Sequence, residues 1–194
     1  MLVKIEHIFN LVVGFVGKIT SVLLLLMICN VFYDVIMRYF FRNSSVGMQE
    51  MEWHLFSIII LFGVSVALKD EGHVRVDFLY EKYSVRTKAM INILGTVFFL
   101  LPLALLIASG SFEFVMDSYR INEISEDPGG LTHRWIIKAM IPFSFLFLIF
   151  SAIGYLVQNI NIYRGAKPGG REEDAALEEA GRGEGKRSVP GGVK

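Results

Sequence analysis

The chain has 194 residues with 19 basic and 19 acidic side chains, and its formal charge of zero gives no reason to expect a nucleic-acid partner. Hydrophobic residues make up 53% of the chain, the mean hydropathy is +0.49, and the apolar residues lie in long unbroken runs. This composition excludes an ordinary water-soluble domain and indicates a protein that crosses a membrane several times.

Four apolar stretches are long enough, or nearly so, to cross a hydrocarbon layer about 30 Å thick as helices of roughly 20 residues. We predict an all-α polytopic membrane protein with four transmembrane helices, at about 16–37, 51–68, 89–112 and 135–160. Residues 1–163 then form one membrane domain. Residues 164–194 hold eight of the 18 glycines among mixed charges, so we expect a disordered cytoplasmic tail.

The first span is the only one that could be mistaken for a signal peptide, because Lys4 precedes it. The apolar region is too long and lacks a small-residue cleavage site, so we expect a membrane helix. Lys18 interrupts it, and its ammonium is expected to reach back to lipid headgroups, with a role in transport as the alternative. Asp34 and Arg38 face each other at helical spacing and are expected to pair. Arg38 opens an aromatic stretch typical of a membrane interface.

The second span follows a turn at residues 43–47. Glu50 and Glu52 stand just outside its apolar part, and Trp53 is expected to anchor it at the interface. Small side chains permit close helix contact, so we expect this helix to be buried between others. They are Ser57, Gly63, Ser65 and Ala67.

The stretch from Lys69 to Tyr83 joins the two halves of the chain and mixes charged with apolar residues. This pattern favours a cytoplasmic connector at the headgroup boundary, partly an amphipathic helix. A connector that contacts only lipid is an equally open interpretation. Ser84 then favours the start of the third helix, in which Pro102 is expected to produce a bend.

The fourth span opens with Arg134 and Trp135 after a turn predicted at residues 127–130. Lys138 lies one turn inside it, where a charge is costly unless it is paired. Its acidic candidates are Glu113, Asp117, Glu50 and Asp34.

Nine basic residues lie near the termini and the connector, against four on the opposite side, so positive-inside bias places both termini in the cytoplasm. The acidic residues then line the outer face.

No catalytic, nucleotide-binding or zinc motif occurs, so we expect neither an enzyme nor a bound cofactor or metal. The single cysteine, Cys29, excludes an intrachain disulfide. All four histidines lie near span ends, which disfavours haem ligation. Mid-depth polar residues are isolated, among them Asn30 and Asn92, so a solute pathway through these helices alone is not expected.

Several segments resemble the small permease subunit of tripartite ATP-independent periplasmic (TRAP) transporters, the DctQ-like family. They are Arg38-Tyr-Phe-Phe41, Glu50-x-Glu52, Ala67-Leu-Lys69, Gly72-His-Val-Arg-Val-Asp77 and Arg134-Trp-Ile-Ile-Lys138 with Pro142. The resemblance covers about residues 10–160. Two features depart from the family pattern: Gly47-Met48 replaces an aromatic residue that often precedes the acidic pair, and the tail has no counterpart.

The resemblance implies a scaffold subunit in the bacterial inner membrane, within a sodium-driven importer of organic anions such as carboxylates. Its partners would be a large permease subunit, which carries the sodium and solute sites, and a periplasmic solute-binding protein. No solute ligand is carried onto this chain. The structural or interface candidates are Arg38, Glu50, Glu52, Trp53, Lys69, Gly72, His73, Arg75, Asp77, Arg134, Trp135 and Lys138.

For the connector, we expect Arg75 and Asp77 to fix it against the second and third spans or the large subunit, with His73 making a hydrogen bond. The alternative function is a self-contained four-helix membrane protein, either a haem-binding electron carrier or a small channel.

Overall fold

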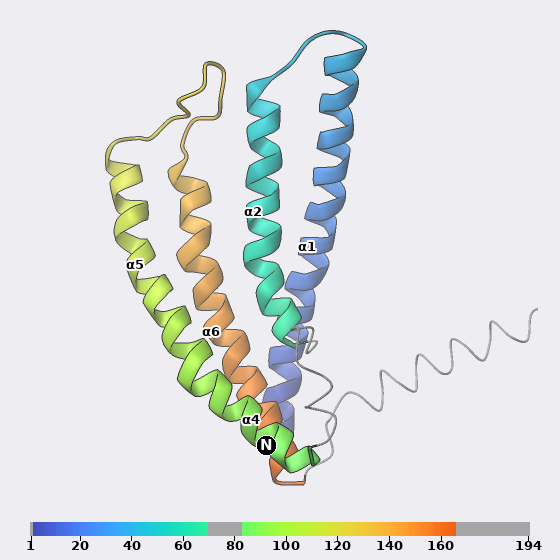
Figure 1. Cartoon of the computed structure of the whole chain (residues 1–194), viewed down its shortest axis with the longest axis vertical. Coiled ribbons are helices and arrows are strands. Elements are labelled where there is room, and N and C mark those ends of the chain that lie inside the picture. The colour runs from blue at the N-terminus through green and yellow to red at the C-terminus, as the bar shows by residue number, and fades with distance from the viewer. Residues whose placement is uncertain (1, 70–82, 166–194) are drawn as a thin grey trace, which may run out of the picture.

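The computed structural model describes residues 2–69 and 83–165 and, within these ranges, the side chains from residue 6 onward. The helices are α1 (Leu2–Tyr39), α2 (Val46–Lys69), α4 (Val85–Gly95), the π-helical segment η1 (Thr96–Leu100), α5 (Leu101–Arg120) and α6 (Trp135–Tyr163). The segments α4, η1 and α5 follow one another as a single long helix (Figure 1). Four helices are long and apolar enough to cross a membrane, so the predicted all-α, four-span fold is confirmed.

Helix α6 is the centre of the bundle, because it packs against α1, α2, α4 and α5. In its most apolar window 28% of the residues are buried, against 6% in α1 and 11% in α2. The small side chains of the second span predict that it is the buried helix. Helix α2 does lie between α1 and α6 (Figure 1), but a Cβ added to its Gly63 would meet nothing within 4 Å.

The reason for the central position of α6 is a face of small side chains that lets neighbouring helices approach closely. A Cβ added to Gly154 would lie 2.7 Å from the Cβ of Phe9 on α1. The Phe9 ring in turn lies 4.4 Å from that of Phe150. The buried core consists of Leu68, Ala104, Leu148, Ala152 and Tyr155.

The third helix changes its hydrogen-bond register where a bend was expected. The Leu101 N–H donates to the carbonyl of Thr96, five residues back, at the end of η1. Pro102 has no N–H to donate, so the regular pattern is interrupted at this point. At the start of α4, the Ser84 hydroxyl accepts the Thr87 N–H at 3.2 Å, which confirms the predicted cap.

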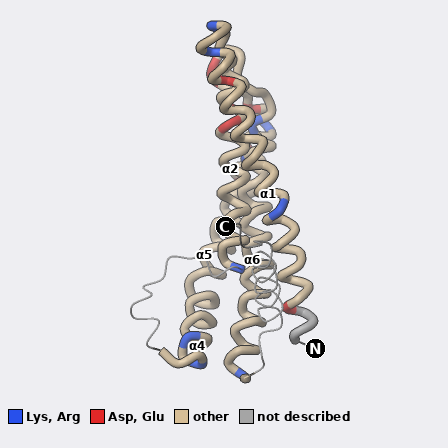
Figure 2. Tube along the Cα trace, turned by 90° about the vertical axis from the view of Figure 1, so that its right-hand side faces the viewer, with Lys and Arg blue, Asp and Glu red and all other residues tan. Residues whose placement is uncertain are grey.

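The helices are longer than the spans predicted from the sequence, since α1 begins at Leu2 and α6 ends at Tyr163. A Cβ on Gly14 would lie 3.3 Å from the Lys69 ammonium, so Lys69 and Gly14 lie at the same level. Counting roughly 20 residues, or about 30 Å, toward the other end leads to Asp34 on α1 and Gln49 on α2. Most charged positions lie toward the two ends of the bundle, with a basic position of α1 between them (Figure 2).

Candidate functional site

The connection between α5 and α6 is an ordered hairpin, defined here as residues 121–134. The Ser125 N–H donates to the Leu131 carbonyl at 3.1 Å, and the Arg134 N–H donates to the Glu123 carbonyl at 3.1 Å. At its tip the Gly130 N–H donates to the Asp127 carbonyl at 3.0 Å, which confirms the predicted turn. The hairpin is therefore a fixed surface at this end of the bundle.

Glu50, on the first turns of α2, holds the hairpin in place. Its carboxylate accepts the Leu131 backbone N–H at 2.5 Å and a hydrogen bond from the Ser125 hydroxyl. A Cβ on Gly130 would collide with the Ser125 side chain and lie 2.9 Å from a Glu50 oxygen. Glycine at position 130 therefore allows the Glu50 carboxylate to contact the hairpin.

Lys138 pairs with Glu123 of the hairpin, and not with any of the four acidic residues that the sequence analysis named. Its ammonium also lies 4.2 Å from the centre of the Phe114 ring on α5. The pairing arises because the hairpin folds back over the start of α6. The hydrogen bond from Lys138 lowers the pKa of Glu123 by stabilising its charged form.

On α1 the predicted pair of Asp34 and Arg38 is present. The Asp34 side chain is 4% exposed and that of Arg38 is 46% exposed, so the arginine connects a buried carboxylate to the surface. One turn before Asp34, the Asn30 amide donates to the Met48 carbonyl at 3.0 Å, which ties α1 to α2. This end of the bundle is therefore held by polar contacts between helices and loops.

The remaining candidates at this end differ in exposure. Trp53 is 69% exposed, as an interface anchor would be, and Glu52 is half-buried. Trp135 is half-buried and packs edge-on against Tyr119 of α5, with the ring centres 5.3 Å apart. Arg134 is half-buried and lines a cavity with Glu50 and Trp53.

The opposite end of the bundle contains buried polar contacts that the sequence analysis missed. The Asn161 amide donates to the Glu6 carboxylate at 2.8 Å, and both side chains are buried. The Asn92 amide donates to the Asn159 side-chain oxygen at 2.8 Å, which joins α4 to α6. The sequence contains a signal for these contacts, because Gln158, Asn159 and Asn161 lie within four residues at the end of an apolar run.

Lys69, the first residue of the connector, lies at this second end, beside Gly14 of α1. The other connector candidates, Gly72, His73, Arg75 and Asp77, lie outside the described residues. Their expected role therefore stays a prediction from the sequence, as does the tail from residue 166 onward.

The chain is similar in sequence to known proteins. Residues 27–161 match the family described as tripartite ATP-independent periplasmic transporters, DctQ component. A Haemophilus influenzae protein named as a TRAP transporter small permease is 26% identical over 96 residues. The matched part is 50% of this chain and 58% of that relative. The family match covers most of the chain and each of the four spans wholly or in part, and we conclude that the chain is a multi-pass inner-membrane protein belonging to the DctQ family of TRAP transporter components.

Proposed function

We propose that this chain is the fixed scaffold subunit of a TRAP transporter that imports organic anions, such as carboxylates, with a sodium gradient. A large permease subunit carries the sodium and solute sites, and a periplasmic binding protein delivers the solute. Both termini and the connector of this chain face the cytoplasm. Membership of the DctQ family supports the general assignment to a transporter.

The observation that carries the proposal is the packing at mid-depth. There the Phe62 ring of α2 lies 5.9 Å from each of the rings of Phe143 and Phe147 on α6. Two buried hydroxyls of the same region, on Ser65 and Ser151, have no hydrogen-bond partner among the described residues. A pathway for an anion needs a polar lining, whereas an apolar seam of aromatic side chains suits a rigid support.

A scaffold also needs surface for a partner, and α1 offers the most. Large apolar side chains follow one another along its outer side at intervals of three and four residues. They include Ile8, Leu11, Phe15, Val22 and Leu25, each more than half exposed. This stripe suits contact with lipid or with a helix of the large subunit.

The test is uptake by the assembled system. The chain should be co-expressed with the large permease encoded in a neighbouring reading frame, reconstituted into vesicles and supplied with the secreted binding protein. We expect sodium-dependent uptake of an organic acid by the complete set and none when this chain is left out. Transport by this chain alone would overturn the proposal, and haem absorbance of the purified chain would support the electron carrier instead.

The connector can be tested separately. If Asp77 fixes it in the complex, Asp77→Ala should reduce recovery of the large subunit with this chain. Glu81→Ala removes an acidic residue of the same segment and serves as the control. A role for Asp77 would be contradicted if both variants gave equal recovery of the large subunit and if uptake stayed at the wild-type rate.

Docking of the binding protein on the outer acidic residues is a second part of the proposal. Glu50 is turned into the hairpin, so its replacement would disturb the fold as well as the surface charge. Glu52, Asp117 and Glu126 are better choices, since Asp117 and Glu126 are exposed and Glu52 is half-buried. Neutralising these three should raise the concentration of binding protein that gives half-maximal uptake; an unchanged value would rule out this docking surface.

A further inference from the structure

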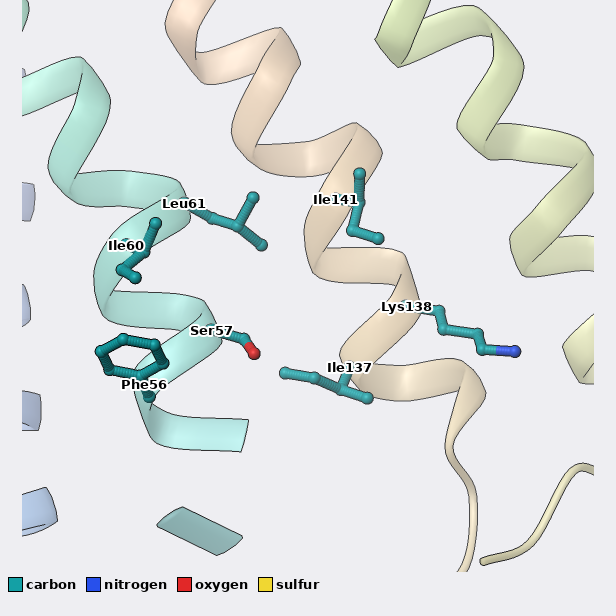
Figure 3. A pocket seen from close by; sticks show the side chains of 7 residues that line it. All are labelled: Phe56, Ser57, Ile60, Leu61, Ile137, Lys138 and Ile141. Carbon is teal, nitrogen blue, oxygen red and sulfur yellow. The ribbon is translucent and has the colours of Figure 1, made fainter. Parts of the chain in front are cut away.

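A crevice runs between α2 and α6 at the end of the bundle that carries the hairpin. Its inner part is a cavity of about 360 Å³. Its lining residues are Phe56, Ser57, Ile60 and Leu61 of α2 with Ile137, Lys138 and Ile141 of α6. Figure 3 shows the Lys138 ammonium pointing away from α2, so only the carbon chain of Lys138 adds to the wall. The Ser57 hydroxyl donates to the Trp53 carbonyl at 2.7 Å, which leaves the wall essentially apolar.

A second cavity, of about 280 Å³, lies next to the first on the side of the hairpin and is called the mouth of the crevice. Its lining residues are Val46, Gln49, Glu50, Trp53, His54, Asp127 and Arg134. Trp53 and His54 are one helical turn from the α2 residues of the inner cavity, and Arg134 is one turn from Ile137 on α6. The polar cavity therefore lies directly beyond the apolar one, toward the hairpin.

The mouth contains two carboxylates, those of Glu50 and Asp127, and one guanidinium, that of Arg134. Within the described ranges, neither Arg134 nor Asp127 forms a direct ion pair. Glu50 is different, because its two oxygens already accept hydrogen bonds from Ser125 and Leu131. A guanidinium that is half-buried beside a cavity is well suited to a phosphate group, which it can bind through two N–H donors.

The depth of the crevice fits a membrane lipid. The mouth lies beside Gln49, where the count along α2 places the boundary of the hydrocarbon layer, and Trp53 lies at the same boundary. The inner cavity then falls within the hydrocarbon layer. A headgroup in the mouth would leave an acyl chain pointing along the apolar cavity.

We propose that the crevice between α2 and α6 binds one zwitterionic phospholipid. Its phosphate lies at Arg134, its headgroup ammonium lies at Asp127, and one acyl chain lies between the two helices. The site is independent of the transport function proposed above. An apolar helix of a partner protein would fill the inner cavity but would offer no charged group to Arg134 and Asp127, neither of which forms a direct ion pair within the described ranges, and this favours the lipid.

The test uses Trp53, which lines the mouth, as a fluorescent reporter. Trp135→Phe makes Trp53 the single tryptophan of the full chain. This variant is reconstituted into phosphatidylglycerol vesicles with a minor, increasing fraction of brominated phosphatidylethanolamine, or of diacylglycerol with the same brominated chains. Bromine quenches tryptophan at short range, so we expect stronger quenching by the phosphatidylethanolamine.

Substitutions identify the contacts. With Arg134→Gln, the phosphatidylethanolamine fraction that gives half-maximal quenching should rise about tenfold, which corresponds to about 1.4 kcal/mol. Arg120→Gln removes an arginine at the same end of the bundle whose guanidinium is 3.7 Å from exposed Asp117, and it should change nothing. The converse variant, Trp53→Phe, leaves Trp135, on the α5 side, as the single tryptophan. Both lipids should quench the fluorescence of Trp135 equally.

A cavity-filling variant separates binding from folding. Ile141→Phe narrows the apolar cavity without changing any charge, and it should also remove the excess quenching. Equal quenching of Trp53 by both lipids in the single-tryptophan chain would overturn the proposal. So would a preference that survives in Arg134→Gln, or an absence of quenching by either lipid, which would mean that a protein segment occupies the crevice.

Discussion

The Glu50 carboxylate accepts the Leu131 backbone N–H at 2.5 Å, although 81 residues separate them in the chain. Glu50 belongs to the start of α2, and Leu131 belongs to the hairpin that precedes α6. A single acidic side chain thus fixes the hairpin to the neighbouring helix. The hairpin surface at this end of the bundle, including the mouth of the crevice, depends on this contact.

Replacing Glu50 should release the hairpin while leaving the helices in place. Glu50→Gln removes the negative charge that strengthens the hydrogen bonds from Leu131 and Ser125. We expect faster hydrogen exchange at the Leu131 amide, measured by mass spectrometry on the detergent-solubilised chain. Glu52→Gln is the matched control, and equal exchange rates in the two variants would show that Glu50 does not hold the hairpin.

Gly130 should not tolerate a side chain. A methyl group there would collide with Ser125 and lie 2.9 Å from Glu50, and overpacking of this kind costs about 1–3 kcal/mol. Gly130→Ala should therefore lower the thermal unfolding midpoint. Gly110→Ala adds the same atom on α5, where nothing lies within 4 Å, and should not lower it. A wild-type midpoint for Gly130→Ala would contradict the packing described here.

The contact of Glu123 with Lys138 should make stability depend on acid pH. Because the pKa of Glu123 is lowered, the contact stabilises the fold above the unfolded pKa of about 4.5 and loses its effect as the pH falls through the folded value. At pH 7 the unfolding midpoint of wild type should exceed that of Glu123→Gln by its largest amount. This difference should become smaller below about pH 4.5. Glu126→Gln serves as the control for the same hairpin. A difference that stays constant between neutral and acid pH would exclude this mechanism.

The hydrogen bond between Asn92 and Asn159 should couple α4 to α6. Interhelical hydrogen bonds in membrane proteins contribute about 0.6 kcal/mol on average, and up to about 1.7 kcal/mol, in double-mutant cycles. We expect a coupling in that range between Asn92→Ala and Asn159→Ala, measured by unfolding in a mixed micelle. Asn30→Ala, at the other end of the bundle, should show no coupling to Asn159→Ala. Additive effects of the first pair would mean that the hydrogen bond does not stabilise the fold.

Local features could be predicted because their partners are close in sequence. Asp34 and Arg38 are four residues apart on one helix, so their pairing follows from the helical repeat. The cap at Ser84 and the turn after Asp127 likewise depend on residues within one turn of the chain. Contacts between segments far apart in the chain could not be predicted in this way: Glu50 binds Leu131 of the hairpin, and nothing in the sequence around Glu50 indicates that partner.

The sequence by itself determined that four apolar helices cross a membrane, because hydrocarbon requires a fixed length of uncharged helix whatever the neighbours are. Only the tertiary structure decided which of those helices is central, which acid neutralises Lys138, and that Glu6 meets Asn161 across 155 residues. These pairings depend on the angle at which helices cross and on how the hairpin folds back. Neither is recorded in the periodicity of a single helix, whose apolar side chains suit lipid and protein neighbours equally.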